Sequence, residues 1–117
     1  MAIEFKDYYR IFARHPDFRV RSADLLCDLE LAPWEAVLGA SIRMRTLEGS
    51  VSLKIPPSAA AGQQLRLRGN GLPTKEGKRG DLFAIVSIQV PTDAGEEEKA
   101  LWEQLARKSD FNPRKQS

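Results

Sequence analysis

The side chains that could catalyse a reaction are few in this chain. Its only histidine, His15, directly precedes a proline, and its only cysteine is Cys27. A nucleophilic triad needs a histidine held in a structured pocket beside a serine or a cysteine. His15 lies near the N-terminal junction instead, and Cys27 falls on the apolar side of a predicted strand, where a small core residue is expected. We therefore expect a binding protein and not an enzyme.

Two other patterns resemble ligand sites but lack parts of them. Asp24, Asp28 and Glu30 alternate along one predicted strand. No carbonyl-rich turn surrounds them, so a hydrated strand face is favoured over a cation site. Gly69-Asn70-Gly71 lacks the further glycine and the following helix of a dinucleotide-binding loop, and a single cysteine excludes a cysteine-rich zinc site. The sequence predicts no metal and no cofactor.

Arginines occur in alternating pairs on two predicted strands. Arg43 and Arg45 form one pair, and Arg66 and Arg68 form the other. Because alternate residues of a strand share a face, these side chains could contact phosphates in a sequence-independent, salt-sensitive way. The chain has 18 basic and 16 acidic side chains, a net charge of +2. That balance is far from the strongly basic charge of a dedicated nucleic-acid binder, so a solvated sheet face is the plainer interpretation.

Alternation of apolar and polar residues predicts a set of short strands. The first run begins at Asp24 and places four residues on one face: Leu25, Cys27, Leu29 and Leu31. This is the period of a half-buried strand. Similar runs cover residues 42–45, 51–55 and 65–67. Reversals are expected at Leu47-Glu48-Gly49-Ser50 and at Gly69-Asn70-Gly71.

The last strand, Leu82 to Val90, is the most apolar. Five alternate residues share the face that should point into the core: Leu82, Ala84, Val86, Ile88 and Val90. Pro91 then closes the sheet, because proline cannot donate a ladder hydrogen bond.

Helical spacing occurs in two places. Pro33 suits the first turn of a short helix that Gly39 ends, with an apolar side made of Trp34, Val37 and Leu38. A longer helix should run from Asp93, which resembles a capping-box residue paired with Glu96, to about Lys108. Its apolar stripe is Leu101, Trp102, Leu105 and Ala106, and Phe111 follows in a basic tail.

At 117 residues the chain has room for one domain of ordinary size. A domain this small buries only about 60–70% of its unfolded surface, so association with a second copy would add stability. Residues 1–7 contain no apolar signal-peptide core, and no run approaches the roughly 18 apolar residues of a membrane span. We expect a cytoplasmic protein with no membrane partner.

Short blocks follow one another in a characteristic order. They are His15-Pro16-Asp17-Phe18, Ala32-Pro33-Trp34-Glu35-Ala36-Val37-Leu38-Gly39-Ala40, Ile55-Pro56-Pro57, Gly62-Gln63, Leu65-Arg66-Leu67-Arg68-Gly69, Gly71-Leu72, Gly80-Asp81-Leu82, Leu101-Trp102 and Phe111-Asn112-Pro113. From His15 to about Lys115 the chain resembles the second C-terminal β domain of the DnaJ co-chaperones, most closely the curved-DNA-binding type without a zinc-finger module. The resemblance implies a mainly β fold, a small twisted β-sandwich with one short helix and a C-terminal helix.

The N-terminal residues resemble a different module. Phe5-Lys6-Asp7-Tyr8-Tyr9-Arg10-Ile11 looks like the opening of a J domain, which stimulates a DnaK-type ATPase, and His15-Pro16-Asp17 spells that module's signature. Only three residues separate the two pieces, too few for the basic helix that a J domain has there. We therefore divide the chain into a vestigial J-domain-like segment at 1–14, a DnaJ C-terminal β domain at 15–92, and a dimerisation helix and tail at 93–117.

The resemblance implies a C-terminal module of a DnaJ-type co-chaperone that binds unfolded polypeptide clients and forms a homodimer. A DnaK-type chaperone would be reached only through a J domain, which we expect to be absent here. The dimer contact is expected at Leu101, Trp102, Leu105 and Phe111. The alternative for Leu101 and Leu105 is that they dock the helix on its own sheet. The competing hypothesis for function is a non-specific or curved-DNA-binding module associated with the nucleoid.

Overall fold

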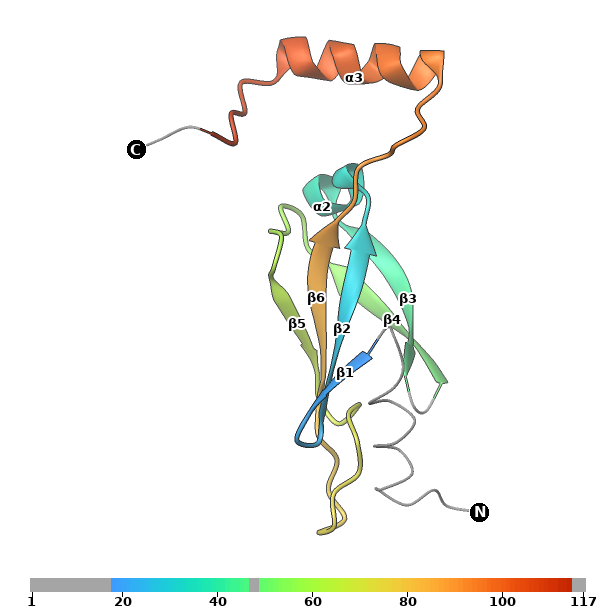
Figure 1. The fold of residues 1–117 in the computed structure, drawn as a ribbon, viewed down its shortest axis with the longest axis vertical. Helices are drawn as coiled ribbons and strands as arrows, with labels where there is room; N and C mark the ends of the chain where they lie inside the picture. Colours follow the sequence, from blue (N-terminus) through green and yellow to red (C-terminus); the bar gives the residue numbers. More distant parts are fainter. Residues whose placement is uncertain (1–17, 47–48, 115–117) are drawn as a thin grey trace.

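The computed structural model describes residues 18–46 and 49–114 of the chain (Figure 1). Its elements are β1 (Phe18–Arg21), β2 (Asp24–Leu31), α2 (Pro33–Leu38), β3 (Ala40–Thr46), β4 (Gly49–Ile55), β5 (Gln64–Leu67), β6 (Leu82–Ile88) and α3 (Glu96–Lys108). Strands predominate, which confirms the mainly β fold. The predicted segment 1–14, the candidate His15 and the middle of the first predicted reversal, residues 47–48, lie outside the described residues.

The strands form two sheets. The larger has four strands in the order β1-β2-β6-β5, and β3 and β4 form a separate antiparallel hairpin. At the centre of the larger sheet β2 and β6 run parallel, with Leu25 opposite Leu82 and Leu31 opposite Ile88. The edge strands β1 and β5 pair antiparallel with them. The hairpin lies against one face of the larger sheet (Figure 1).

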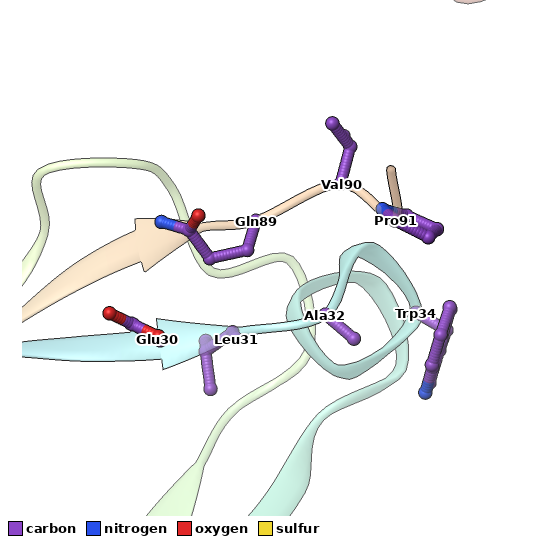
Figure 2. A pocket seen from close by; sticks show the side chains of 7 residues that line it. All are labelled: Glu30, Leu31, Ala32, Trp34, Gln89, Val90 and Pro91. Carbon is purple, nitrogen blue, oxygen red and sulfur yellow. The ribbon is translucent and has the colours of Figure 1, made fainter. Parts of the chain in front are cut away.

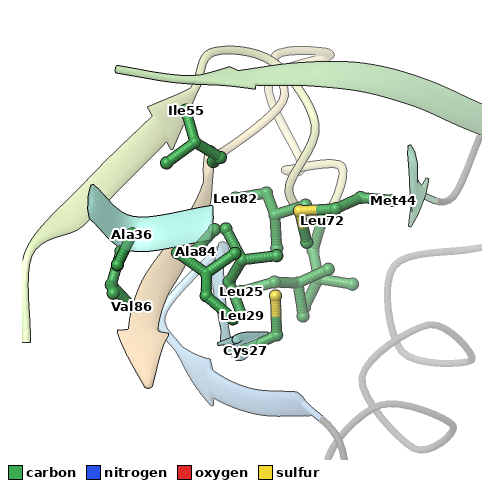
Figure 3. Close-up of a cluster of buried hydrophobic side chains, with 11 residues drawn as sticks. Leu25, Cys27, Leu29, Ala36, Met44, Ile55, Leu72, Leu82, Ala84 and Val86 are labelled. Carbon is green, nitrogen blue, oxygen red and sulfur yellow. The ribbon is translucent and has the colours of Figure 1, made fainter. Parts of the chain in front are cut away.

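The core fills the space between the larger sheet and the hairpin (Figure 3). Because side chains alternate across a strand, every second residue of β2 and β6 points into it. Its buried members are Leu25, Cys27, Leu29, Leu31, Ala36, Met44, Ile55, Leu72, Leu82, Ala84 and Val86. Two sheets enclosing one core confirm the predicted sandwich. Cys27 is 4% exposed, which confirms its place as a core residue.

Two glycines close the end of the body that lies opposite α3. A Cβ on Gly71 would lie 2.6 Å from the carbonyl oxygen of Ala23, and a Cβ on Gly80 would lie closer still to the same oxygen. The Leu72 N–H donates to that carbonyl at 2.7 Å. Gly69, with φ of +73°, makes the predicted reversal. The glycines of this segment therefore allow its backbone to pack closely against the backbone at Ala23.

The last strand is shorter than predicted. β6 ends at Ile88, which is 36% exposed, and Val90 is 70% exposed. Its neighbour β2 ends at Leu31 because Pro33 begins α2, so no strand lies beside Val90. The expectation that Val90 points into the core is wrong for this reason. Ile88 lies opposite the buried Leu31, on the core side of the sheet, but at the end of the strand it is only partly covered.

The long helix begins later than predicted. Its N-cap is Gly95, which offers no side-chain hydrogen bond, so the expected capping box with Asp93 is wrong. The carbonyl of Gly95 accepts the Lys99 N–H at 2.9 Å. Three glutamates in the first turn, Glu96 to Glu98, face the positive end of the helix dipole instead. The helix ends at Lys108, as predicted. No helix within the described ranges combines the length and the apolar content that crossing a bilayer requires.

Candidate interaction surface between two helices

The helices α2 and α3 lie beyond the carboxyl ends of β2 and β6 (Figure 1). An apolar groove lies between the two helices. Its volume is about 640 Å³. The lining residues come from both helices and from the segment after α3: Pro33, Trp34, Val37, Leu38, Glu98, Leu101, Trp102, Leu105, Ser109 and Phe111. We call this surface the α2–α3 groove.

Local signals in the sequence place α2 on one side of the groove. The Glu35 carboxylate accepts the Ala32 N–H at 2.8 Å and closes the first turn. Gly39, with φ of +84°, ends the helix and donates its N–H to the Glu35 carbonyl at 2.9 Å. Ala36 is the only buried residue of α2. The larger apolar side chains of this short helix therefore remain outside the core: Trp34, Val37 and Leu38.

One aromatic contact joins the two sides of the groove. The rings of Trp34 and Trp102 lie 6.2 Å apart between centroids and are tilted by 39°. The indole N–H of Trp102 donates to the Glu98 carboxylate one turn earlier on α3, at 2.9 Å. An aromatic pair of this kind contributes about 0.5–1.5 kcal/mol beyond area burial. The contact orients α3 over α2 but covers little of either helix.

Most of the apolar surface in the groove is uncovered. No residue of α3 is buried, and Leu101 is 65% and Phe111 79% exposed. Across the groove Leu38 is 73% exposed. A contiguous exposed apolar patch on a small protein marks an interaction site, whereas single exposed leucines do not. The α2–α3 groove is therefore the candidate site for binding another macromolecule.

The structure brings the four predicted contact residues together in this groove: Leu101, Trp102, Leu105 and Phe111. Leu101 and Leu105 are both more than half exposed and face α2, so they do not dock α3 on its own sheet. The predicted contact did not include Trp34, Val37 and Leu38. The sequence did contain a signal for these three residues, which is their helical spacing on a helix of only six residues. So short a helix can turn only one small residue into the core, and its larger apolar side chains are therefore left outside.

A smaller hollow of about 270 Å³ lies at the ends of β2 and β6 (Figure 2). Its lining is Glu30, Leu31, Ala32, Trp34, Gln89, Val90 and Pro91. Trp34 lines both this hollow and the α2–α3 groove. The exposed side chain of Val90, which the sequence placed in the core, therefore contributes to surface apolar area instead.

Arg66, one of the predicted phosphate-facing residues, is held by an internal carboxylate. Its guanidinium contacts Asp81 at 2.6 and 2.7 Å, and the other oxygen of Asp81 accepts the Gly69 N–H at 2.9 Å. The hydrogen bond from Gly69 and then the one from Arg66 lower the pKa of the Asp81 carboxyl below its ordinary value, because both favour the charged form. The Arg66 guanidinium also lies 5.9 Å from the centroid of the Phe83 ring.

The four predicted arginines do not share one surface. The residues on either side of Arg66 pack against the core, and so do those on either side of Arg43. The two arginines therefore point away from the core on opposite sides of the sandwich. Arg68 is exposed just beyond the end of β5, and the side chain of Arg45 lies outside the described residues. A role in contacting phosphates stays a prediction for all four.

Two of the three acidic residues of β2 make contacts within the fold. The Asp24 carboxylate accepts the Asp81 N–H at 2.7 Å, and Asp28 pairs with Arg19 at 3.2 Å. In the part of the chain that the structure describes, no three His, Cys, Asp or Glu side chains gather where they could hold a metal ion. These carboxylates thus hold backbone and neighbouring strands in place.

Comparison with known proteins gives consistent matches. Residues 5–91 match the family described as the DnaJ C terminal domain. A Curved DNA-binding protein of Pseudomonas putida is 46% identical over 104 residues, which are 89% of this chain and 33% of that protein. Proteins of the same name are 45% identical over 112 residues in Pseudomonas syringae pv. tomato, covering 94% of this chain and 36% of the relative, and 48% identical over 105 residues in Salmonella paratyphi B, covering 89% and 34%. The chain spans about a third of the length of these curated relatives.

Proposed function

The chain belongs to the DnaJ C-terminal domain family, and from this membership we propose that it works as the C-terminal module of a DnaJ-type co-chaperone. In this proposal the module binds unfolded polypeptide clients and joins two copies into a homodimer, in support of a DnaK-type chaperone of the cytoplasm. That chaperone would be reached through a J domain. The module itself binds and positions other proteins and carries out no chemistry.

The uncovered α2–α3 groove is the observation that carries the dimer. Its apolar side chains contribute no hydrophobic free energy while they face water. Their burial in an interface would stabilise the dimer by about 25 cal/mol per Å² of apolar surface. In a twofold dimer the same patch of each copy covers that of the other, so one uncovered groove per chain is sufficient. Exposed charged residues that flank the groove-lining side of α3, such as Lys99 and Lys108, would form the polar rim.

Trp102 is the side chain on which the dimer should depend most. Its ring already rests against Trp34, and its N–H is bonded to Glu98, so its position is fixed before association. A side chain fixed in this way loses little conformational entropy on binding. Aromatic residues of this kind dominate binding energy in interfaces. Phe111, the most exposed of the large apolar residues in the groove, is the second anchor.

Size-exclusion chromatography with light scattering tests the dimer. The wild-type protein should have twice the chain mass of 13.1 kDa. Trp102→Ala should weaken association by about 30-fold or more, since the loss of a central anchor costs about 2 kcal/mol or more. Glu103→Ala changes the same helix outside the groove and should remain dimeric. A monomeric wild type, or an undiminished dimer in Trp102→Ala, would contradict the proposal.

Client binding is supported by apolar surface that lies beside the groove. Val90 is 70% exposed, Ile88 is partly exposed, and the small hollow lies at the ends of β2 and β6, where an extended unfolded chain could place apolar side chains. Fluorescence anisotropy with a labelled, permanently unfolded polypeptide measures this binding. Val90→Ser should weaken it about tenfold through the loss of apolar burial, and Glu103→Ala should leave it unchanged. Equal affinity of Val90→Ser and wild type would remove the hollow from the client site.

A second candidate function is sequence-independent DNA binding. The relatives described above carry the name Curved DNA-binding protein. In this chain Arg43 and Lys54 are exposed and make no ion pair within the described residues. Phosphate contacts release counterions, so affinity for DNA should fall steeply as salt rises. A labelled duplex that fails to bind even at low salt would exclude this candidate.

A further inference from the structure

The two outer faces of the sandwich differ in the carboxylates that are available to pair with their arginine and lysine side chains. On the larger sheet Arg19 pairs with Asp28, and Arg66 pairs with Asp81. On the hairpin neither β3 nor β4 contains an Asp or a Glu. The nearest carboxylate in sequence, Glu48, lies in the connection outside the described residues. The hairpin strands therefore carry positive charge without a balancing carboxylate of their own.

The described side chains on the outward side of the hairpin are all cations or hydroxyls. Strand pairing places Ser52 opposite Arg43 and Ser41 opposite Lys54, and all four side chains are exposed, as is Ser50. The intervening residues pack on the core, so the strand period of two holds the polar set outward. We call Ser41, Arg43, Ser50, Ser52 and Lys54 the hairpin face. Arginine, lysine and serine are among the side chains that donate to phosphate oxygens.

We propose that the hairpin face docks on the phosphate backbone of duplex DNA, a proposal that rests on the second candidate function above. A free two-stranded ribbon can enter the major groove and read bases. This hairpin cannot do so, because its other side is packed against the core. Its contacts are therefore confined to phosphates and carry no sequence information.

Charge and composition favour DNA over an acidic protein as the occupant. Duplex DNA presents one negative charge per about 1.7 Å of its axis, so a face with several closely spaced donors meets a phosphate for each. Protein interfaces instead bury an apolar centre within a polar rim. The hairpin face has no apolar side chain among its described residues, so it lacks the centre that a protein partner would require.

A matched pair of double variants tests the proposal. Arg43→Gln with Lys54→Gln removes two charges from the hairpin face, and Arg19→Gln with Arg21→Gln removes two exposed charges from β1 on the larger sheet. Affinity for a labelled random duplex of about 30 base pairs is measured between about 50 and 200 mM salt. The hairpin variant should lower the salt slope by about two, so its affinity falls about tenfold less over this range. The β1 variant should keep the wild-type slope.

The outcomes separate the docking face from DNA binding itself. Circular dichroism first establishes that both variants are folded. If the hairpin variant keeps the wild-type slope, or if both variants lower it equally, the hairpin face is not the docking surface although DNA binding stands. If the wild-type protein binds no DNA at low salt, both proposals fall. Binding of equal strength to polyglutamate would assign the face to an acidic protein and overturn the choice of DNA.

Discussion

The β body and the C-terminal helix use the same residue types in opposite ways. Leu82 of β6 is fully buried in the core, whereas Leu101 of α3 is 65% exposed. In the body each inward side chain is covered by another part of the same chain, and on α3 no residue is covered to that degree. The apolar side chains of the body are thus covered within the chain, and we call α3 an arm because its apolar stripe is left exposed.

The length of α3 adds to this difference. A helix of 13 residues is marginal in water unless its apolar face is packed, because helix nucleation is unfavourable and few hydrogen bonds follow it. The Trp34–Trp102 contact supplies one packing point within the chain. In the proposed dimer, a second copy would supply the rest of the packing.

The largest expected effect compares a leucine from each region. Leu82→Ala should lower the free energy of unfolding by about 2–5 kcal/mol, because it leaves a cavity in the core. Leu101→Ala should change it by less than about 0.5 kcal/mol, since the side chain is exposed within one chain. Both are measured by urea unfolding in the Trp102→Ala background, at a protein concentration where light scattering finds the monomer, so that association does not contribute.

The result of that comparison decides whether the arm is separate from the body. If Leu101→Ala in the monomeric background destabilised the protein as much as Leu82→Ala, α3 would be part of the cooperative core. The conclusion that α3 is energetically separate from the β body would then be wrong.

A smaller effect is expected at the far end of the body, where Asp81 connects β5 to β6. Because its pKa is lowered in the folded state, the carboxylate stabilises the fold above the unfolded-state value and loses this contribution as pH falls through the folded-state value. Asp81→Asn should therefore be less stable than wild type at neutral pH, and the difference should shrink below about pH 4. Urea midpoints measured across this range show it.

The control for Asp81 is a carboxylate on the linker to α3. Asp93→Asn removes an exposed acid outside every element of the body, and its urea midpoints should follow wild type at each pH. A gap between Asp81→Asn and wild type that stays constant down to pH 2 would contradict the assigned role of the carboxylate.

The smallest effect is expected at the start of the arm. Gly95 caps α3 without a side-chain acceptor, and Gly95→Ser should stabilise the helix by roughly a few tenths of a kcal/mol. Amide hydrogen exchange should slow in the first turn of α3 and stay unchanged in β2 and β6 if the arm is energetically separate. Ala94→Ser, one residue before the cap, should leave exchange unaltered. Slower exchange throughout the core would show that the arm and the body are coupled.

Local periodicity was sufficient to predict most elements of this fold. Apolar alternation in β2 and β6 and the proline and glycine bounding α2 fixed these elements closely. Strand β1 was not predicted, because the first predicted run began at Asp24. The other errors occurred where an element ends. Val90 continues the alternation in sequence but lies beyond the partner strand, and Asp93 has the chemistry of a cap but lies two residues before Gly95. Where a strand or helix begins or ends depends on the neighbouring elements in the fold, and the local sequence pattern contains no information about them.

The candidate surfaces were predicted in part. The stripe of Leu101, Trp102 and Leu105 follows from helical spacing, and the structure places all three in the α2–α3 groove. The part played by α2 could not be predicted, because exposure of Trp34 depends on how α2 packs on the sheets. The arginines show the same limit, since alternation placed Arg43 and Arg66 on outward faces without showing that these faces are opposite.

The residue pattern alone thus determined which side chains share a face on the predicted strands and on α3, because those periods are properties of the local backbone. The parallel pairing of β2 with β6, the capture of Arg66 by Asp81 and the position of α3 over α2 were decided only by the tertiary structure. Each of these joins segments far apart in the chain or belonging to different elements, and local spacing carries no information about which distant groups meet.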